Sequence, residues 1–162
     1  MRRILGVLGN ARTKFFGALN KTVNAGIGPF WLTAGRFQST YTGVVDELLV
    51  IPYETGFYKY AIYADAGDYP VGRLAMSAEV ATVAGKQLRV LVPGLSVTSG
   101  TYYWLAGMGN VGTTSFAGTH TGGRAAYVVK DLAGYNAGHQ TTFGTPVFLG
   151  YDLNMGHANG KI

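Results

Sequence analysis

Apolar and polar residues alternate along most of the chain after Pro29. In residues 58–64, for example, aromatic and aliphatic side chains occupy every second position. A period of two with β-branched and aromatic residues is typical of β-strands. The pattern predicts strands over residues 37–42, 46–52, 58–64, 73–83, 88–92, 102–106, 125–129 and 146–152.

Turn sequences rich in Gly, Pro and Asp separate these predicted strands, among them ETG, DAGDYPVG, VAGK, VPGL, HTGG and FGTP. Short strands separated by such turns favour an all-β sandwich over alternating strands and helices. Residues 127–138 have room for one helical turn at most. The chain contains no apolar run of about 18 residues, so we expect no membrane-spanning helix.

The N-terminal residues follow a different pattern. Apolar residues recur at steps of three and four from Ile4 to Val23, which is helical spacing. Gly6, Gly9 and Gly17 each cost about 1 kcal/mol in a helix interior, so an isolated helix here is marginal. We therefore expect residues 1–28 to form an extended or partly helical arm before a β-sandwich domain over residues 29–162.

The net charge of +5 belongs to this arm. Five basic residues and no acidic residue lie in positions 1–21, whereas eight basic and eight acidic residues follow. This asymmetry favours an arm that docks on a protein partner. A flexible extension, a nucleic-acid arm, a membrane-surface helix and a signal peptide are weaker explanations. The residues expected to make the docking contacts are Arg2, Arg3, Ile4, Leu8, Arg12, Lys14, Phe15, Phe16 and Lys21.

Composition narrows the classes of function. The 162 residues are the size of one ordinary domain. Cys is absent, which excludes disulfides, thiolate metal ligands and thiol nucleophiles. Charged residues make up 13% of the chain, which is about half the usual share, and 25 residues are Gly. Low charge with many Gly, Tyr and Phe residues is typical of a rigid β protein that contacts other proteins.

One motif suggests nucleotide binding. Gly107, Gly109 and Gly112 have the spacing G-x-G-x-x-G after a predicted strand. A dinucleotide site needs a helix directly after this loop, so that the helix N-terminus faces the pyrophosphate. The residues that follow, TTSFAGTHTGGRAA, are not helical in pattern. We expect a wide turn at the edge of the sandwich and no nucleotide cofactor.

The titratable residues give little support for catalysis or metal binding. Asp65 and Asp68 could hold Ca²⁺ in a tight loop, but two carboxylates before a Pro are also ordinary turn chemistry. His120, His139 and His157 are scattered near glycines and have no metalloprotease or hydrolase motif around them. We expect surface or interface histidines, no metal and no enzyme.

Four stretches between Gly35 and Ala106 occur in a recognisable order. FQSTY and DELLVIPY come first; YKYAIYADAGDYPVGRLAMSAEV and KQLRVLVPGLSVTSGTYYWLAG follow. In this order they resemble a jelly-roll β-sandwich module of tailed-phage virion proteins, with its Y-x-D-x-G-x-P-G turn and its final L-x-x-G-x-Y-W-L-A strand. The residues that carry the likeness are Tyr63, Asp65, Gly67, Pro70, Gly72, Leu74, Ser77, Val80, Leu95, Gly100, Tyr102, Trp104, Leu105 and Ala106.

The resemblance implies an antiparallel jelly-roll-like β-sandwich and a structural role in a virion. It implies a capsid decoration protein, or a module of a tail fibre, spike or baseplate, and it brings no catalytic residues. The long trimeric shaft of fibre proteins is not evident here, which favours decoration. Residues after Gly112 lie outside the likeness.

Aromatic residues are too numerous for the core of one small domain. Tyr and Trp offer large contact areas at low entropic cost, so some are expected at binding surfaces. We expect Trp31 and Tyr69 to make such contacts. The expected partners are capsid or tail proteins and further copies of the chain, with a trimer around a capsid axis as one arrangement. The alternative is a carbohydrate-binding module whose aromatic faces stack on a host glycan.

Overall fold

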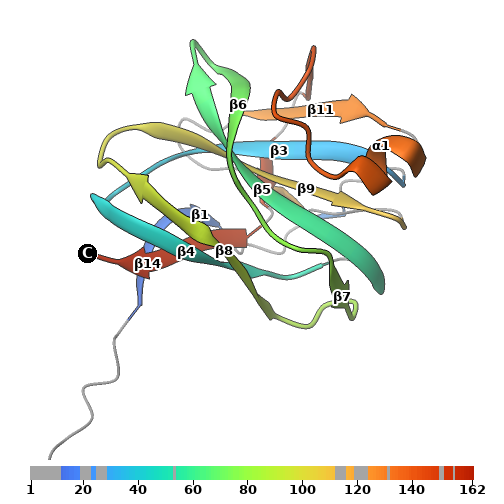
Figure 1. Cartoon of the computed structure of the whole chain (residues 1–162), viewed down its shortest axis with the longest axis horizontal. Coiled ribbons are helices and arrows are strands. Elements are labelled where there is room, and N and C mark those ends of the chain that lie inside the picture. Colours follow the sequence, from blue (N-terminus) through green and yellow to red (C-terminus); the bar gives the residue numbers. More distant parts are fainter. Residues whose placement is uncertain are drawn as a thin grey trace, which may run out of the picture.

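The computed structural model describes residues 12–18, 23–24, 29–52, 54–111, 116–118, 124–130, 132–149, 152–154 and 156–162. Within these residues the protein is an antiparallel β-sandwich, which confirms the predicted all-β class (Figure 1). All the strand pairs are antiparallel. In the described part, no helix is long and apolar enough to cross a membrane.

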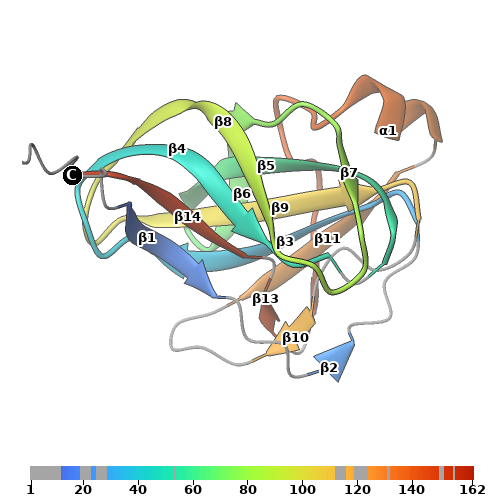
Figure 2. The ribbon, with the colours of Figure 1, turned by 90° about the horizontal axis from the view of Figure 1, so that it is seen from below.

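One layer of the sandwich is a sheet that we call the narrow sheet. Figure 2 shows its strands side by side, with β8 and β1 outermost. The strands, in spatial order, are β1 (Thr13–Ala18), β14 (Gly156–Lys161), β4 (Gly43–Val50) and β8 (Leu88–Val97).

The second layer, the wide sheet, runs in the order β12–β11–β3–β9–β5–β6, and β7 also pairs with β5. Its strands are β12 (Val147–Leu149), β11 (Ala125–Val129), β3 (Trp31–Gln38), β9 (Tyr102–Gly109), β5 (Gly56–Ala66), β6 (Tyr69–Met76) and β7 (Val80–Thr82). A short sheet joins β13 (Asp152–Asn154), β10 (Phe116–Gly118) and β2 (Val23–Asn24).

The main core lies between the narrow and wide sheets. Alternate residues of β5 and β9, such as Tyr60, Ile62 and Leu105, face Leu48 and Val90 of the narrow sheet, and all five side chains are buried. Burial of such side chains on folding stabilises by roughly 1.5–3 kcal/mol each. The alternation in the sequence thus produces the inner faces of both layers.

The wide sheet also has a second buried face, which the one-sided strand pattern did not predict. Trp104 and Met108 of β9 point to this face and pack with Tyr135 of α1 (Leu132–Ala137) and with Phe143. The Tyr135 hydroxyl donates to Glu79 Oε2 at 2.7 Å, which ties α1 to the sheet. Residues 127–138, which were expected to hold one helical turn at most, contain the six-residue helix α1, which is longer than one turn.

The N-terminal arm differs from its prediction. Residues Thr13–Ala18 form β1, which pairs along β14, so this part of the chain belongs to the sandwich. Phe15 and Phe16 are buried in the main core rather than available to a partner. Helical spacing was misleading because a bulge between Lys14 and Phe16 directs two consecutive side chains inward and hides the period of two. Strand β1 thus pairs within the narrow sheet although it precedes the boundary expected at residue 28.

Candidate interaction surface

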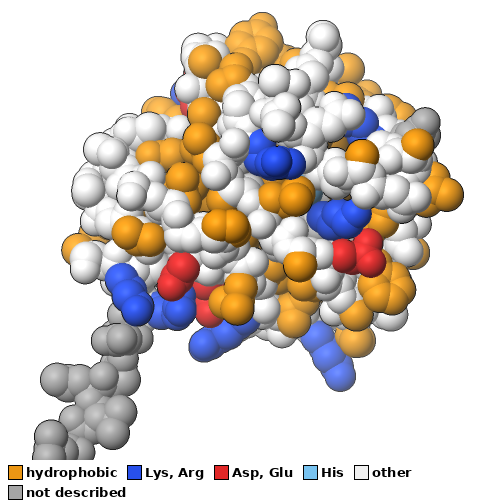
Figure 3. Space-filling model, viewed as in Figure 1, with side chains coloured by type: hydrophobic (Ala, Val, Ile, Leu, Met, Phe, Trp, Pro, Cys, Tyr) orange, Lys and Arg blue, Asp and Glu red, His pale blue; other side chains and the backbone are white. Residues whose placement is uncertain are grey.

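The outer face of the narrow sheet carries four basic residues that we call the basic face: Arg12, Lys14, Arg89 and Lys161. Lys14 lies opposite Asn159, which lies opposite Glu47 of β4. Lys161 lies opposite Val44, and Arg89 lies opposite Leu49. The intervening residues Leu48, Val90 and Ala158 point into the core, so these side chains point outward. Figure 3 shows Lys and Arg side chains beside Asp and Glu at the lower left, near β1 and β14.

Two carboxylates organise this face. Arg12 forms a close ion pair with Asp46, and its Nε lies 3.7 Å from Glu47 Oε2. The hydrogen bond with Asp46 raises the pKa of the Arg12 guanidinium above its ordinary value. Glu47 is almost fully buried, and it accepts a hydrogen bond from Asn159 Nδ2 at 3.2 Å. The two carboxylates therefore hold Arg12 in place, next to the basic residues that precede it in the sequence.

The remaining basic residues are free to meet a partner's charges. Lys14 and Lys161 are exposed, and the Arg89 side chain is 73% exposed, with its Nη1 4.0 Å from Glu47 Oε2. The neighbouring Leu91 is 71% exposed. Cationic side chains around exposed apolar positions are a combination that suits a protein partner with acidic groups.

The structure brings together some of the predicted docking residues and separates others. Arg12 and Lys14 lie on the basic face, whereas Phe15 and Phe16 lie beneath it in the core. Arg89 and Lys161, far away in sequence, join them through the pairing of β1, β14, β4 and β8. No sequence pattern indicated that these basic residues lie close together, because their proximity depends on the order of the strands in the sheet. Outside the described residues lie Arg2, Arg3, Ile4, Leu8 and Lys21.

The two predicted aromatic contacts lie on the wide sheet. Trp31 is half-buried, and one ring face stacks on Tyr127 with 4.6 Å between ring centroids and an interplanar angle of 9°. Tyr69 is 49% exposed and meets Phe148 edge-on at 5.0 Å. Tyr69 therefore presents more free surface than Trp31.

Asp65 and Asp68 are bound by basic side chains of the same chain. Arg36 donates to both oxygens of Asp65, at 2.8 and 3.0 Å, and its Nη2 lies 2.7 Å from Asp68. Trp104 Nε1 also donates to Asp65 at 2.8 Å. Burial would raise the pKa of Asp65, but the hydrogen bonds from Arg36 and Trp104 hold it below its ordinary value. This arrangement favours the turn role over the calcium alternative.

The turn itself follows from local conformation. Gly67 and Asp68 both have positive φ, at 59° and 71°, and Ala66 pairs with Tyr69 around them. Two consecutive residues with positive φ are the signature of the type I′ turn that closes a tight hairpin. Arg124 reaches the outer oxygen of Asp68 at 3.4 Å and helps to hold the turn in place.

The glycine motif is part of a strand. Gly107 and Gly109 lie in β9, opposite Thr33 and Tyr58 respectively, so the expected wide turn is wrong for these two residues. A Cβ at position 109 would overlap the ring of Tyr58, and this close packing explains the glycine. Gly112 lies outside the described residues.

His139 is a core residue, contrary to the expected surface or interface position. Its side chain is fully buried, and Nε2 donates to the Lys59 carbonyl oxygen at 2.8 Å. Burial lowers the pKa of His139 to about 4, so the imidazole is neutral near pH 7. His120 and the side chain of His157 lie outside the described residues. Among the residues described, no group of three or more His, Asp or Glu side chains is placed to hold a metal.

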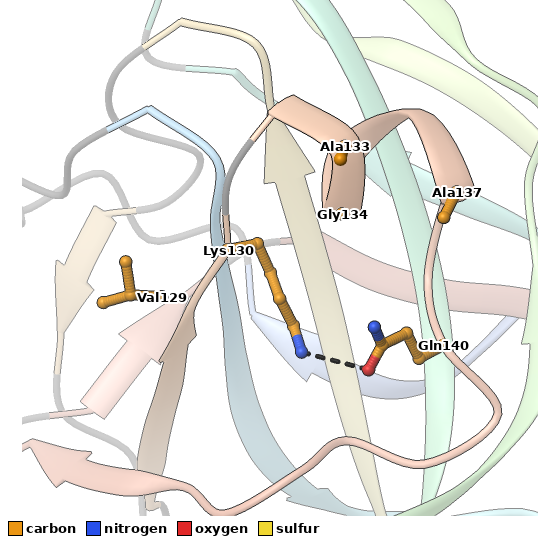
Figure 4. Close-up of a pocket in the computed structure, with 6 residues that line it drawn as sticks. All are labelled: Val129, Lys130, Ala133, Gly134, Ala137 and Gln140. Carbon is orange, nitrogen blue, oxygen red and sulfur yellow. Dashed lines mark hydrogen bonds between the residues drawn. The ribbon is translucent and has the colours of Figure 1, made fainter.

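A shallow groove of about 620 Å³ lies beside α1. In Figure 4, Lys130 and Gln140 reach toward each other across it, with Nζ 3.1 Å from Oε1, while small side chains of α1 form one wall. Its polar groups are an ammonium and a carboxamide. The remaining lining residues are Val129, Ala133, Gly134 and Ala137.

Comparison with known proteins adds no relative to this picture. No protein-family model matches the sequence, and no curated protein matches it.

Proposed function

We propose that this chain is a structural protein of a tailed-phage virion. Its role is that of a capsid decoration protein, which docks on the shell through its basic N-terminal residues and the adjoining sandwich edge. The resemblance of residues 35–106 to virion jelly-roll modules and the antiparallel sandwich support this proposal. The docking arm within it is residues 1–11, since β1 belongs to the domain.

The position of β1 is the observation that carries the docking mechanism. Phe15 and Phe16 fix β1 in the core at the edge of the narrow sheet, next to the exposed Lys14. Residues 1–11, which include Arg2 and Arg3, therefore join the domain at the basic face. We expect residues 1–11 and the basic face to bind an acidic partner together.

A stable protein contact buries about 800 Å² on each partner. An arm of eleven residues together with the basic face can supply such an area, since each extended residue adds roughly 3.3 Å of length. Repetition over a symmetric shell would add avidity to weak single contacts. Because the contact is largely ionic, it weakens as salt concentration rises.

The test compares three proteins for binding to particles that lack this chain. They are the full chain, residues 12–162, and the full chain with Lys14→Glu, Arg89→Glu and Lys161→Glu. We expect the truncated protein to fold like the full chain and to lose most of its particle binding, and the charge-reversed protein to lose binding as well. Sedimentation with particles and electron microscopy of intact virions would measure both effects.

Two results would contradict the proposal. The chain could be missing from purified virions by mass spectrometry, or residues 12–162 could decorate particles as well as the full chain does. Triple substitution to Gln in place of Glu is a matched control, because it removes the charges without reversing them and should weaken binding less.

The alternative function, a carbohydrate-binding module of a tail fibre, spike or baseplate, is favoured by one observation. Tyr69 is half-exposed beside Arg124, whose guanidinium stacks over Phe148 at 4.5 Å. An aromatic face next to a hydrogen-bond donor suits a sugar ring. On a glycan array, Tyr69→Ala should abolish any signal of the full chain, whereas the equally exposed Phe57→Ala should not. A full chain without glycan affinity removes this alternative.

A further inference from the structure

The outer edges of the two large sheets are protected to different degrees. At β1, the Thr40 N–H and Oγ1 both donate to the Phe15 carbonyl oxygen, at 2.9 and 3.0 Å. At β6, residues 141–143 pair along the edge. The edge strand β12 has only three residues, and short edges attract few partners. The fourth edge, β8, has ten residues.

The outer edge of β8 has no backbone partner among the described residues. In the described part of the chain, β8 forms strand pairs with β4 only, and no other backbone hydrogen bond reaches residues 88–92, although β6 of the wide sheet lies near β8. Leu91 on this edge is 71% exposed. A long edge with free N–H and C=O groups and an exposed Leu is a template for another strand.

We propose that β8 pairs antiparallel with β8 of a second copy of the chain, about a twofold axis at Val90. This pairing joins two narrow sheets into one continuous sheet. It is an isologous contact, in which each copy uses the same surface. The inference goes beyond the proposed function, since it concerns the free protein and does not require a virion.

Pro93 and the side-chain pattern determine the register. Pro93 has no N–H, and the pairing of β8 with β4 is irregular next to it, so the usable segment is residues 88–92. Centring the pairs on Val90 uses this whole segment. Centring them on Arg89 would place two Arg side chains opposite each other, and centring them on Leu91 would run into Pro93.

The register centred on Val90 gives favourable side-chain contacts on both faces of the combined sheet. On the core side, Val90 meets Val90 of the second copy, which extends the buried row. On the outer side, Arg89 of each copy meets Leu91 of the other, so its aliphatic stem covers the exposed Leu. Leu91 lies opposite Glu47 on β4, so the incoming guanidinium also approaches a carboxylate.

A second copy fits this edge better than a ring of three copies does. A closed trimer needs a heterologous contact, in which β8 of one copy meets a different edge of the next. The other edge strand of the narrow sheet is β1. Its Phe15 carbonyl oxygen already accepts hydrogen bonds from Thr40. Five paired residues bury less than the roughly 800 Å² per partner of a stable complex, so the dimer is weak.

Analytical ultracentrifugation of the full chain over a range of concentrations tests this inference. The mass should rise from 17.2 kDa toward twice that value as concentration increases. Leu91→Lys should stay monomeric, because the introduced ammonium would face Arg89 of the second copy. The double variant Arg89→Glu with Leu91→Lys should dimerise again, because each introduced carboxylate would then face an introduced ammonium. The Arg89 and Leu91 side chains are more than two-thirds exposed, so folding should persist.

Val44→Lys is the matched control, since it adds a charge to the same outer face but away from the edge. This variant should dimerise like the unmodified chain. Hydrogen exchange should slow at residues 88–92 of the dimer. A mass that stays at 17.2 kDa at every concentration, a trimer, or a dimer that Leu91→Lys leaves intact would each overturn the inference.

Discussion

The edge strands β6 and β8 differ in whether another segment of the chain forms backbone hydrogen bonds with their outer side. At β6, the Arg73 N–H donates to the Thr141 carbonyl oxygen at 2.8 Å, and the Phe143 N–H donates to the Val71 carbonyl oxygen at 3.1 Å. The chain thus covers this edge with its own residues 141–143, through an isolated bridge between Gly72 and Thr142. At β8, no backbone hydrogen bond other than those with β4 reaches residues 88–92 in the described part of the chain, and Pro93, which has no N–H, limits the segment that is open to pairing.

The two edges also differ in what lies beneath them. The segment that covers β6 is anchored by side chains in the second core: Phe143 meets Tyr63 edge-on at 5.3 Å, and His139 donates to the Lys59 carbonyl oxygen. The segment that covers β6 should therefore unfold together with the domain. The outward residues Arg89 and Leu91 of β8 are more than two-thirds exposed, so they are available for contact between molecules.

The largest effect should come from removing the anchor at β6. Phe143→Ala should cost about 3–5 kcal/mol of unfolding free energy, because the side chain is fully buried and its loss leaves a cavity. Urea unfolding followed by circular dichroism would measure it. Phe57→Ala is the control, since Phe57 is 48% exposed and should cost far less. Equal costs would mean that residues 141–143 are not anchored as described.

A second, smaller effect should appear on acidification. His139 has a pKa of about 4 in the folded protein, below the ordinary 6.5 of the unfolded chain. The unfolded chain therefore binds the proton first as pH falls. The contribution of His139 to stability is complete above pH 6.5 and is lost as pH falls toward 4, by about 3 kcal/mol in total.

His139→Gln isolates this contribution, since its amide can still donate to the Lys59 carbonyl oxygen and does not titrate. Unfolding free energies measured between about pH 4 and pH 7.5 should fall more steeply for the unmodified chain than for the variant. Hydrogen exchange at acidic pH should accelerate at residues 71–73 before it does so in β8. Parallel pH profiles of the two proteins would refute the assignment of His139 as a buried neutral side chain.

The strands were predictable from sequence where each has a single inward face or a clear turn beside it. The strand expected at 125–129 is confirmed with the same bounds, and the stretch 88–92 begins β8 correctly. The start of β3 was missed, since the expected strand began at residue 37 rather than at Trp31. Residues such as Leu32, Thr33 and Ala34 are all buried, so the alternation on which the prediction depended is absent there.

The candidate surface was less predictable than the fold. Charge asymmetry identified the basic N-terminal residues, but Arg89 and Lys161 join Lys14 only through strand order, which periodicity does not encode. Likewise, His139 was expected at the surface or at an interface, because its partner on β5 lies far away in the chain. Local patterns determine elements, whereas the neighbours of an element are a property of the whole topology.

The smallest effect on unfolding free energy should come from a substitution at the outer edge of β8. Leu91→Ser removes a large apolar side chain, yet that side chain is 71% exposed, and no backbone hydrogen bond other than those with β4 reaches this part of β8 in the described residues. Measured at low concentration, where the chain is monomeric, the unfolding free energy should change by no more than about 0.5 kcal/mol. Val90→Ser, one residue away but buried, should cost several times as much, because it places a hydroxyl in the main core. If Leu91→Ser were as costly as Val90→Ser at low concentration, β8 would already be covered within one chain, and its contrast with β6 would disappear.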